Sequence, residues 1–580
     1  MTGNQRPEFT QAEEGQDGTG AESGNAPIMP FLGQILEHVP GESITVQRTL
    51  TLAEDLHLAD HVFVHAPGVK PLSACLPVLP MTISLEVMAE TAACLAPDHG
   101  LIGFEDVQAT RWIELEDTDT LTLRITGRHA RADPQHQIHR IETAIYIEGR
   151  TSPAIRANAL FARSYQLDLS LNFTEFANPR RHRLTAEQAY RERLLFHGPR
   201  YQSLVGDILL GDAGVIGELL VRPPADLFRS VRQPQLLTDP QLLDGIGQII
   251  SIWAAESERY AFPIGFGKLE LYRPTPPAGT RVPVRVEITS NEAKTLHANI
   301  EIEDGAGAVW MRVRDWRMWK FRWERRMVDF RRQPVRSLLS EPAALPSLAP
   351  AAVCRMLSIS DLSSLDAGLL ARLCLHMDEM PEFAAKSGVP QRQKQWLLGR
   401  VAAKDAVREW LAKAAGAEEM LHPAAFVIDN DARGQPAAKH LSGPGPVPKV
   451  SIAHCEDRAI AIADDEAVGV DIERIAARDP GFLEAISTKA ERGLLTDQHG
   501  GGASDGADEW TTRLWCAKEA AGKLLGTGVD GAPRRFEAVA VGMDGVIQIQ
   551  PPGGERLVFV ATTRDGDFII AHATAGTREL

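Results

Sequence analysis

Apolar and polar residues alternate along many segments of the first 330 residues, as they do in strands with one buried face. Residues 120–125 (TLTLRI) and 282–288 (VPVRVEI) are two examples. Two longer apolar stretches, residues 82–93 and 240–253, follow or begin with a proline and have the length of a helix. A long helix followed by several strands, occurring twice, predicts two α+β units of similar size in tandem.

The composition along the chain divides it further. Residues 1–28 are rich in Gly, Glu, Gln, Asn and Thr, so we expect a disordered leader there. Pro, Ser and Ala dominate residues 331–350, which we expect to form a linker. A chain of 580 residues is too long for one core. The sequence therefore predicts a first domain over residues 29–330 and a second over residues 351–580.

Overall composition narrows the classes of function. A hydrophobic content of 44% with 24% charged residues is typical of a globular protein, and the net charge of −16 argues against a general nucleic-acid binder. No apolar run approaches the length of a membrane span, and the N-terminal residues are unlike a signal peptide. Six scattered cysteines without CxxC spacing favour a reducing compartment. We therefore expect a cytoplasmic protein with neither a membrane nor a nucleic-acid partner.

Two segments of the second domain carry charged residues at matched spacings. In the segment VGVDIE, Asp471 and Glu473 leave the same face of a predicted strand, because side chains alternate along a strand. In the segment WCAKEAAGK, Glu519 and Lys523 lie four residues apart and share one face of a predicted helix. Three such carboxylates suit a Mg²⁺ ion that also holds a diphosphate. Either segment alone is typical of a solvated strand end or an exposed helix, so their conjunction is what favours a site.

These segments match the two defining motifs of the Sfp-type 4'-phosphopantetheinyl transferases, (V/I)G(V/I)D(I/V)E and WxxKEAxxK, and residues 351–580 resemble that family. The resemblance implies a pseudo-twofold α/β domain that uses Mg²⁺ and moves phosphopantetheine from coenzyme A to a serine of an acyl carrier protein. It implies that Asp471, Glu473 and Glu519 hold Mg²⁺. Glu519 would also accept the serine proton, and Lys523 would stabilise the leaving group. The implied coenzyme A contacts are Arg400, Lys404, His454, Lys518 and Lys523.

Three motifs of the first domain resemble the double-hotdog dehydratase domain of polyketide and polyunsaturated-fatty-acid synthases. LADHVF presents His61, LLDGIGQ presents Asp244 and Gln248, and FHGPRYQ places His197 where the family has Tyr. The resemblance implies that His61 removes the α-proton of a β-hydroxyacyl thioester while a protonated Asp244 gives its proton to the departing hydroxyl. That division needs an apolar tunnel that raises the pKa of Asp244. Gln248, one turn further on, would orient Asp244 or the hydroxyl.

The sequence leaves alternatives for the first domain. His57 and His65 compete with His61, and His65 stands where the family motif has Gly. The loop after His61 is similar to that of dehydratases from enediyne-type and related iterative synthases, some of which also carry a C-terminal phosphopantetheinyl transferase. The first hypothesis is thus a dehydratase fused to a transferase.

A second hypothesis keeps the transferase and makes the hotdog region a catalytically silent docking module. A third, a noncatalytic binding partner, requires the whole charged set of the second domain to be accidental. Either enzyme hypothesis implies a carrier protein or carrier domain as the partner. Because hotdog domains commonly dimerise, a homodimer through the first domain is a further expectation.

Overall fold

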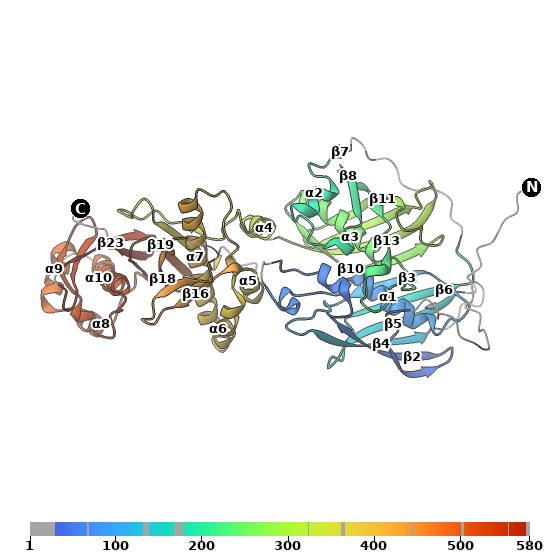
Figure 1. Ribbon diagram of the computed structural model, residues 1–580, viewed down its shortest axis with the longest axis horizontal. Coiled ribbons are helices and arrows are strands. Elements are labelled where there is room, and N and C mark those ends of the chain that lie inside the picture. Colours follow the sequence, from blue (N-terminus) through green and yellow to red (C-terminus); the bar gives the residue numbers. More distant parts are fainter. Residues whose placement is uncertain are drawn as a thin grey trace, which may run out of the picture. The chain divides into compact units, whose positions relative to one another are not determined.

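The computed structural model describes residues 29–65, 69–130, 138–166, 176, 179–322, 324–360, 366–441, 445–499, 504–554 and 556–575. The chain divides into two compact units: Met1–Phe63 with Lys70–Trp323, and Val64–Val69 with Glu324–Leu580 (Figure 1). The expected leader, residues 1–28, lies outside the described residues. Among the described helices, none has both the length and the apolar character needed to cross a membrane.

The first unit contains a 13-stranded antiparallel sheet and two long helices. The strands are β1 (Gln34–Val39), β2 (Ser43–Thr51), β3 (Gly100–Ala109), β4 (Thr120–His129), β5 (His139–Ile147), β6 (Ile155–Ala162), β7 (Arg180–Arg181), β8 (Leu204–Gly211), β9 (Gly214–Leu220), β10 (Tyr260–Leu271), β11 (Arg281–Asn291), β12 (Thr295–Glu303) and β13 (Val309–Phe321). The helices are α1 (Met81–Ala93), α2 (Ala186–Arg191) and α3 (Pro240–Ala255), with 3-10 turns η1 (Leu56–Asp60), η2 (Leu72–Cys75), η3 (Pro199–Tyr201) and η4 (Pro224–Asp226).

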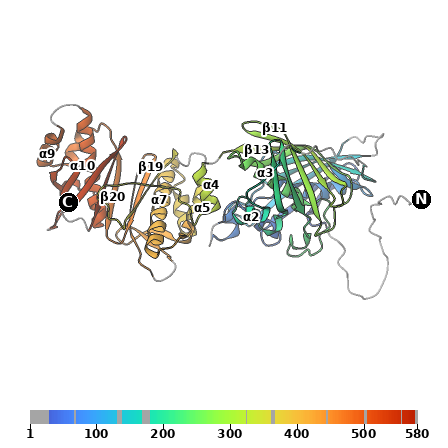
Figure 2. The ribbon, with the colours of Figure 1, turned by 90° about the horizontal axis from the view of Figure 1, so that it is seen from above.

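The sheet falls into two halves, each packed on one buried helix. The order β1-β2-β4-β5-β6-β3 surrounds α1, the order β10-β13-β12-β11-β9-β8-β7 surrounds α3, and β3 pairs with β10 to join them (Figure 1). Figure 2 shows α3 with β11 and β13 of the second half from above. Helix α3 begins at Pro240, whose fixed φ suits the first turn, and Asp239 caps it by accepting from the Leu242 amide at 2.9 Å. The predicted strands and both predicted helices are confirmed, and the unit is a double hotdog.

The second unit contains two smaller antiparallel sheets, each with one long helix against it. Its strands are β14 (Glu341–Pro342), β15 (Val353–Ser358), β16 (Val427–Asn430), β17 (Pro436–Lys439), β18 (Lys449–Cys455), β19 (Arg458–Asp464), β20 (Val468–Arg474), β21 (Glu537–Val541), β22 (Val546–Gln550), β23 (Val558–Asp565) and β24 (Phe568–Thr574). Its helices and turns are α4 (Arg325–Arg332), α5 (Ala367–Cys374), η6 (Met377–Glu379), α6 (Met380–Ala385), α7 (Pro390–Ala415), η7 (Pro423–Ala425), α8 (Pro480–Ile486), α9 (Lys489–His499), α10 (Ser504–Leu525) and η8 (Pro533–Arg535).

The two sheets of this unit repeat one topology. The order β15-β19-β18-β17-β16 in the first corresponds to β20-β24-β23-β22-β21 in the second, with α7 and α10 as the central helices. The turn η7 precedes β16 just as η8 precedes β21. The expected pseudo-twofold α/β architecture is therefore present, and the fold class is α+β as predicted.

The segment expected to be a linker is packed rather than solvated. Residues 331–350 include the end of α4 and the short strand β14, which pairs with β15. Leu339 is fully buried, and the Asp405 carboxylate on α7 accepts from the amides of Leu339 and Ser340 at 2.8 and 2.9 Å. A Pro- and Ala-rich composition did not reveal this role, because the segment is held through its backbone amides, which every residue except proline carries.

Candidate active sites

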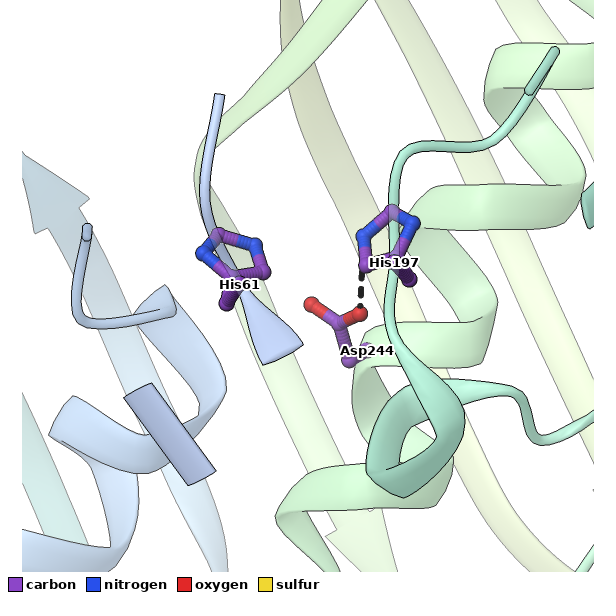
Figure 3. A group of neighbouring side chains, drawn as sticks. All are labelled: His61, His197 and Asp244. Carbon is purple, nitrogen blue, oxygen red and sulfur yellow. Dashed lines mark ion pairs between the residues drawn. The ribbon is translucent and has the colours of Figure 1, made fainter. Parts of the chain in front are cut away.

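The first candidate site lies between the two halves of the double hotdog and is centred on His61 (Figure 3). His61 follows η1 and donates through Nδ1 to the Val78 carbonyl at 2.8 Å, which leaves Nε2 with its lone pair. The pKa of His61 is lowered to about 4, chiefly by burial and also by the neighbouring His197, although Asp244 partly opposes the shift. At neutral pH His61 is therefore uncharged and able to accept a proton.

Asp244 faces His61 from the second turn of α3 and is held by a hydrogen-bond network. Gln248, one helical turn on, donates to Asp244 Oδ2 at 2.7 Å and to the Tyr201 carbonyl at 2.8 Å. The Tyr190 hydroxyl donates to the Gln248 amide oxygen and accepts from the Leu204 amide at 3.1 Å. Gln248 thus has a fixed orientation and holds the Asp244 carboxyl, which is one of the two roles expected for it.

His197 is the residue of this site for which the sequence indicated a motif position but no catalytic role. Its Nε2 lies 3.1 Å from Asp244 Oδ2, and one ring nitrogen each of His61 and His197 and one Asp244 carboxylate oxygen lie within 4.8 Å of one another (Figure 3). The available signal was its place in the FHGPRYQ motif, at the position where the related dehydratases have Tyr. Asp244 and His197 are 47 positions apart, so only the folded chain shows that they touch.

His197 also changes the expected protonation of Asp244. The dehydratase resemblance requires a raised pKa for this carboxyl, and burial does raise it. However, the nearby charge and hydrogen bond of His197, with His61 and Gln248, outweigh burial and lower the pKa of Asp244 below its ordinary value. The expectation of an isolated protonated Asp244 is therefore wrong for this structure.

The histidines that competed with His61 lie outside this cluster. Among the described residues the cluster comprises His61, His197 and Asp244, without His57 or His65. His57 is fully buried behind the site, with its Nδ1 3.1 Å from the Tyr201 hydroxyl. Burial lowers the pKa of His57 to about 3.

The second candidate site lies in the second unit, where β20 packs against α10. A Cβ atom at Gly469 would lie 2.0 Å from the Ala520 carbonyl oxygen, so only glycine lets the helix approach the strand this closely. The approach places Lys523 Nζ 2.8 Å from Asp471 Oδ1 and 3.0 Å from the Val470 carbonyl oxygen. The glycine of the VGVDIE motif therefore serves this packing.

Three carboxylates gather at this place. Burial raises the pKa of Glu519, and the negative charges of Asp471 and Glu473 raise it further, whereas Lys523 opposes them. Glu473 is held by Arg478 at 3.1 Å and by the Trp515 indole N–H at 3.4 Å. The carboxyl groups of the strand and the helix thus interact electrostatically, and their role as metal ligands stays a prediction.

The residues present fit a divalent cation. Asp471 Oδ2 is buried and accepts no hydrogen bond within the described part of the chain. A buried carboxylate oxygen without a partner costs free energy, and like charges held together cost more. A hard cation bound by Asp471, Glu473 and Glu519 would satisfy both, and oxygen-only ligands suit Mg²⁺.

His454 and Arg400 stay candidates for coenzyme A. Partial burial lowers the pKa of His454, Lys523 lowers it further, and Asp471 and Glu473 oppose this, so His454 lies close to the carboxylate cluster. The Arg400 guanidinium stacks 4.9 Å from the centre of the Trp396 ring, and its Nε is buried without a partner among the described atoms. Its Nη2 lies 3.6 Å from Glu382 Oε2, and a contact between Arg400 and coenzyme A stays a prediction.

The assignment of Lys518 and Lys404 to coenzyme A is wrong for this structure. Lys518 is fully buried and bonds Glu491 Oε1 at 2.6 Å and the Ile486 carbonyl at 2.7 Å. Lys404 is fully buried as well and bonds Glu379 at 2.6 Å. An ammonium group that is saturated by a buried carboxylate and carbonyl oxygens holds the fold and cannot reach a phosphate.

A segment of each half of the chain matches the model of a known protein family. Residues 175–326 match the model of the polyketide synthase dehydratase N-terminal domain, and residues 467–561 match that of the 4'-phosphopantetheinyl transferase superfamily. The first segment contains His197, Asp244 and Gln248, and the second contains the three carboxylates and Lys523. The two resemblances inferred from the sequence are confirmed over these segments.

Individual relatives are more distant. A polyunsaturated fatty acid synthase polypeptide of Thraustochytrium sp. is 23% identical over 262 residues, which is 43% of this chain and 8% of that relative. The dehydratase domain from the CurK module of curacin polyketide synthase is 18% identical, with a TM-score of 0.38, and covers 51% of this chain and 99% of its own. A dehydratase domain from Brevibacillus brevis is also 18% identical, with a TM-score of 0.39, and covers 51% of this chain and all of its own (100%).

Proposed function

We propose that the second unit transfers 4'-phosphopantetheine from coenzyme A to a serine hydroxyl of an acyl carrier protein. The observation that carries this proposal is the buried Asp471 Oδ2 oxygen, which has no partner among the described residues, together with Glu519, whose pKa is raised by burial and by the charges of Asp471 and Glu473. Three adjacent carboxylates with one such oxygen are suited to holding a metal ion. The match of residues 467–561 to the transferase superfamily supports the same function.

Different residues of the second unit would bind the metal, stabilise the leaving group and accept the serine proton. Mg²⁺, held by the three carboxylates, would neutralise charge on the diphosphate of coenzyme A. Lys523, which holds Asp471 at 2.8 Å, lies at the rim and would stabilise the departing phosphate. Glu519, whose pKa is raised, is the carboxylate best matched to accepting a proton from the serine hydroxyl. His454 and Arg400 would hold the rest of coenzyme A.

The transferase is tested by incubating an apo carrier protein with coenzyme A, Mg²⁺ and the full chain, followed by mass spectrometry. We expect the carrier to gain one phosphopantetheine arm, and Glu519→Ala to lower the rate about 100-fold or more. Glu466→Ala, which removes an exposed carboxylate just before β20, serves as the matched control and should leave the rate unchanged. Undiminished transfer by Glu519→Ala would contradict the site.

For the first unit we propose dehydration of β-hydroxyacyl thioesters carried on the same kind of carrier protein. The observation in favour of this activity, over a silent docking module, is the convergence of a neutral buried His61 on the Asp244–His197 pair. A docking module has no need for an uncharged histidine poised against a carboxylate. The match of residues 175–326 to a dehydratase domain agrees with it.

The dehydratase is tested with a synthetic β-hydroxyacyl carrier thioester and detection of the loss of water by mass spectrometry. We expect turnover by the wild type and a fall of about 100-fold or more with His61→Ala. His182→Gln removes another buried histidine of the same unit, one that contacts the Leu184 backbone, and is the matched control. A wild type that leaves the thioester intact would establish the docking module instead.

Both proposed activities act on a carrier protein, and the transferase also requires coenzyme A. All six cysteines are free thiols, which agrees with the proposed reducing cytoplasm. A homodimer through the hotdog unit stays a prediction, to be measured by light scattering of the full chain.

A further inference from the structure

The acid side of the first site is a pair of residues rather than a single carboxyl. His197 Nε2 lies 3.1 Å from Asp244 Oδ2, and the two side chains are 8% and 10% exposed. Gln248 donates to the same oxygen at 2.7 Å. The other ring nitrogen of His197, Nδ1, is buried and has no hydrogen-bond partner among the described atoms. The ring is thus tied to the site through its contact with Asp244.

This geometry raises the question of where the acid proton resides. Dehydration requires a proton for the departing hydroxyl, and Asp244 by itself is held ionised, because His197 lowers the pKa of its carboxyl. An imidazole in hydrogen-bond contact with that carboxylate is the group able to carry the proton instead. We propose that His197 and Asp244 act as one acid, with the transferable proton held between His197 Nε2 and Asp244 Oδ2. This proposal rests on the dehydratase function proposed for the same site.

The proton and electron balance is complete within the site. His61 Nε2 takes the α-proton, and the electrons of that C–H bond form the new C=C bond. The Cβ–O bond breaks, and its oxygen leaves as water after receiving the proton of the His197–Asp244 pair. The proton on His61 then returns to the pair through solvent, which restores both groups without any oxidant or reductant.

Other titratable groups surround this pair. His61 faces it from the segment after η1, and Tyr190 reaches it through Gln248 from α2. Tyr201 packs on His61 from η3, and His57 lies behind the Tyr201 hydroxyl. The Asp60–Arg200 ion pair, at 2.9 Å, lies next to Tyr201. Burial raises the pKa of both tyrosines above their ordinary value, so at neutral pH both stay uncharged.

The proton is observed directly by NMR of the full chain labelled with ¹⁵N at histidine, with His197→Gln used to assign the ring signals. We expect both ring nitrogens of His197 to carry protons in the wild type, and Asp244→Asn to abolish the second proton. The pH at which His197 loses it should coincide with the alkaline limb of kcat/KM for dehydration. A His197 ring with one proton throughout the active pH range overturns the proposal.

This measurement separates the proposal from the function on which it rests. If the wild type dehydrates no thioester, the proposed activity fails, although the NMR spectrum still reports the shared proton. If dehydration occurs and His197 is neutral, the activity stands and the shared acid fails.

A kinetic test uses His197→Gly with added imidazoles. We expect this variant to lose about 100-fold in kcat with KM changed by less than about 3-fold, as for the removal of a general acid. Substituted imidazoles should restore the rate, with an alkaline limb that follows the pKa of the added imidazole. If formamide restores the rate equally well, or if the alkaline limb does not change with the pKa of the added imidazole, His197 has a purely structural role. Activity that is lost to a chelator and restored by Zn²⁺ would also overturn the proposal, in favour of a metal at these three side chains.

Discussion

The two halves of the second unit share a fold and differ in charge. In each half a buried lysine of the central helix pairs with a buried glutamate, Lys404 with Glu379 and Lys518 with Glu491, both at 2.6 Å. Each glutamate also accepts an amide from the first strand of the following hairpin. Each lysine also donates to a proline carbonyl at the start of the turn before that strand. The repeated pair therefore belongs to the architecture.

The strand beside the helix differs between the halves. Arg355 of β15 pairs with Ala461, and Asp471 of β20 pairs with Ala571, each partner being the fourth residue of its strand. Arg355 and Asp471 thus occupy corresponding positions. A carboxylate of the proposed metal site in the second half corresponds to a cation in the first.

The helix residue that pairs with each of these strand residues also has the opposite charge in the two halves. Five positions after the buried lysine, the first half has Glu409, which lies 3.2 Å from Arg355. The second half has Lys523 there, 2.8 Å from Asp471. The same strand-to-helix ion pair is present with the charges exchanged. In the second half it leaves Asp471 Oδ2 buried without a partner among the described atoms.

The residue after each buried lysine completes the comparison. Asp405 is satisfied by the chain itself, because it accepts from the amides of Leu339 and Ser340 and from the Ser340 hydroxyl. Glu519 instead faces Asp471 and Glu473, and its pKa is raised. In the first half, backbone amides thus occupy the carboxylate of Asp405. In the second half, the corresponding carboxylate, Glu519, is left beside two other acidic residues. The repeated lysine–glutamate pair therefore stabilises the fold in both halves, whereas the proposed chemistry depends on carboxylates that are present in the second half alone.

The largest effect is expected from removing a buried lysine. Lys518→Met should lower the free energy of unfolding by ~3–5 kcal/mol, because it leaves Glu491 charged and unpaired in the core. Lys404→Met should do the same, whereas Lys523→Met should cost ~1 kcal/mol or less, since its ion pair is partly exposed. Urea unfolding of the full chain measures all three. Equal losses for Lys518 and Lys523 would contradict the division between an architectural and a catalytic lysine.

The second effect concerns metal binding at the two corresponding carboxylates. Millimolar Mg²⁺ should raise the Tm of the second unit in the wild type, by the free energy of binding to the folded state. Glu519→Gln should abolish this rise, and Asp405→Asn should keep it while lowering the Tm in the absence of metal. Calorimetry identifies the second unit as the transition that Mg²⁺ moves. A rise that survives Glu519→Gln would place the metal elsewhere.

The smallest effect is the dependence of stability on pH at Glu519 without metal. Its pKa is raised in the folded state, so the ionised form is disfavoured there and costs stability at pH values above that pKa. Glu519→Gln should therefore raise the metal-free Tm by ~2 °C at pH 7.5, and the gain should vanish as pH falls below about 4.5, where the carboxyl is protonated in both states. An equal gain at both pH values would show that charge is not its cause.

Local pattern was sufficient for a large part of the fold. Alternating apolar positions identified β4 and β11, and proline-bounded apolar stretches identified α1 and α3. This was possible because the period of a strand or helix determines which residues of one short stretch are apolar. Residues 331–350 were misjudged, because their place depends on backbone amides that bond Asp405 more than sixty positions away.

The transferase lysines show the limit of motif matching. Lys518 and Lys523 belong to one short motif, yet five positions place them about 140° apart around a helix, so they cannot face the same site. Glu519 and Lys523, four positions apart, can. The motif resemblance nevertheless assigned both lysines to coenzyme A, and the burial of Lys518 against Glu491 became visible only in the folded chain.

The sequence by itself determined the fold class and the two family resemblances, because each depends on residues close together in the chain or on a motif of fixed spacing. It also predicted the three carboxylates of the second unit as metal ligands. The tertiary structure decided which lysine is buried and which histidine meets Asp244. It also decided the charge state of that carboxyl, since a pKa depends on burial and on neighbours from distant segments. His197 shows this most clearly: its contact with Asp244 turns an expected neutral acid into an ionised partner.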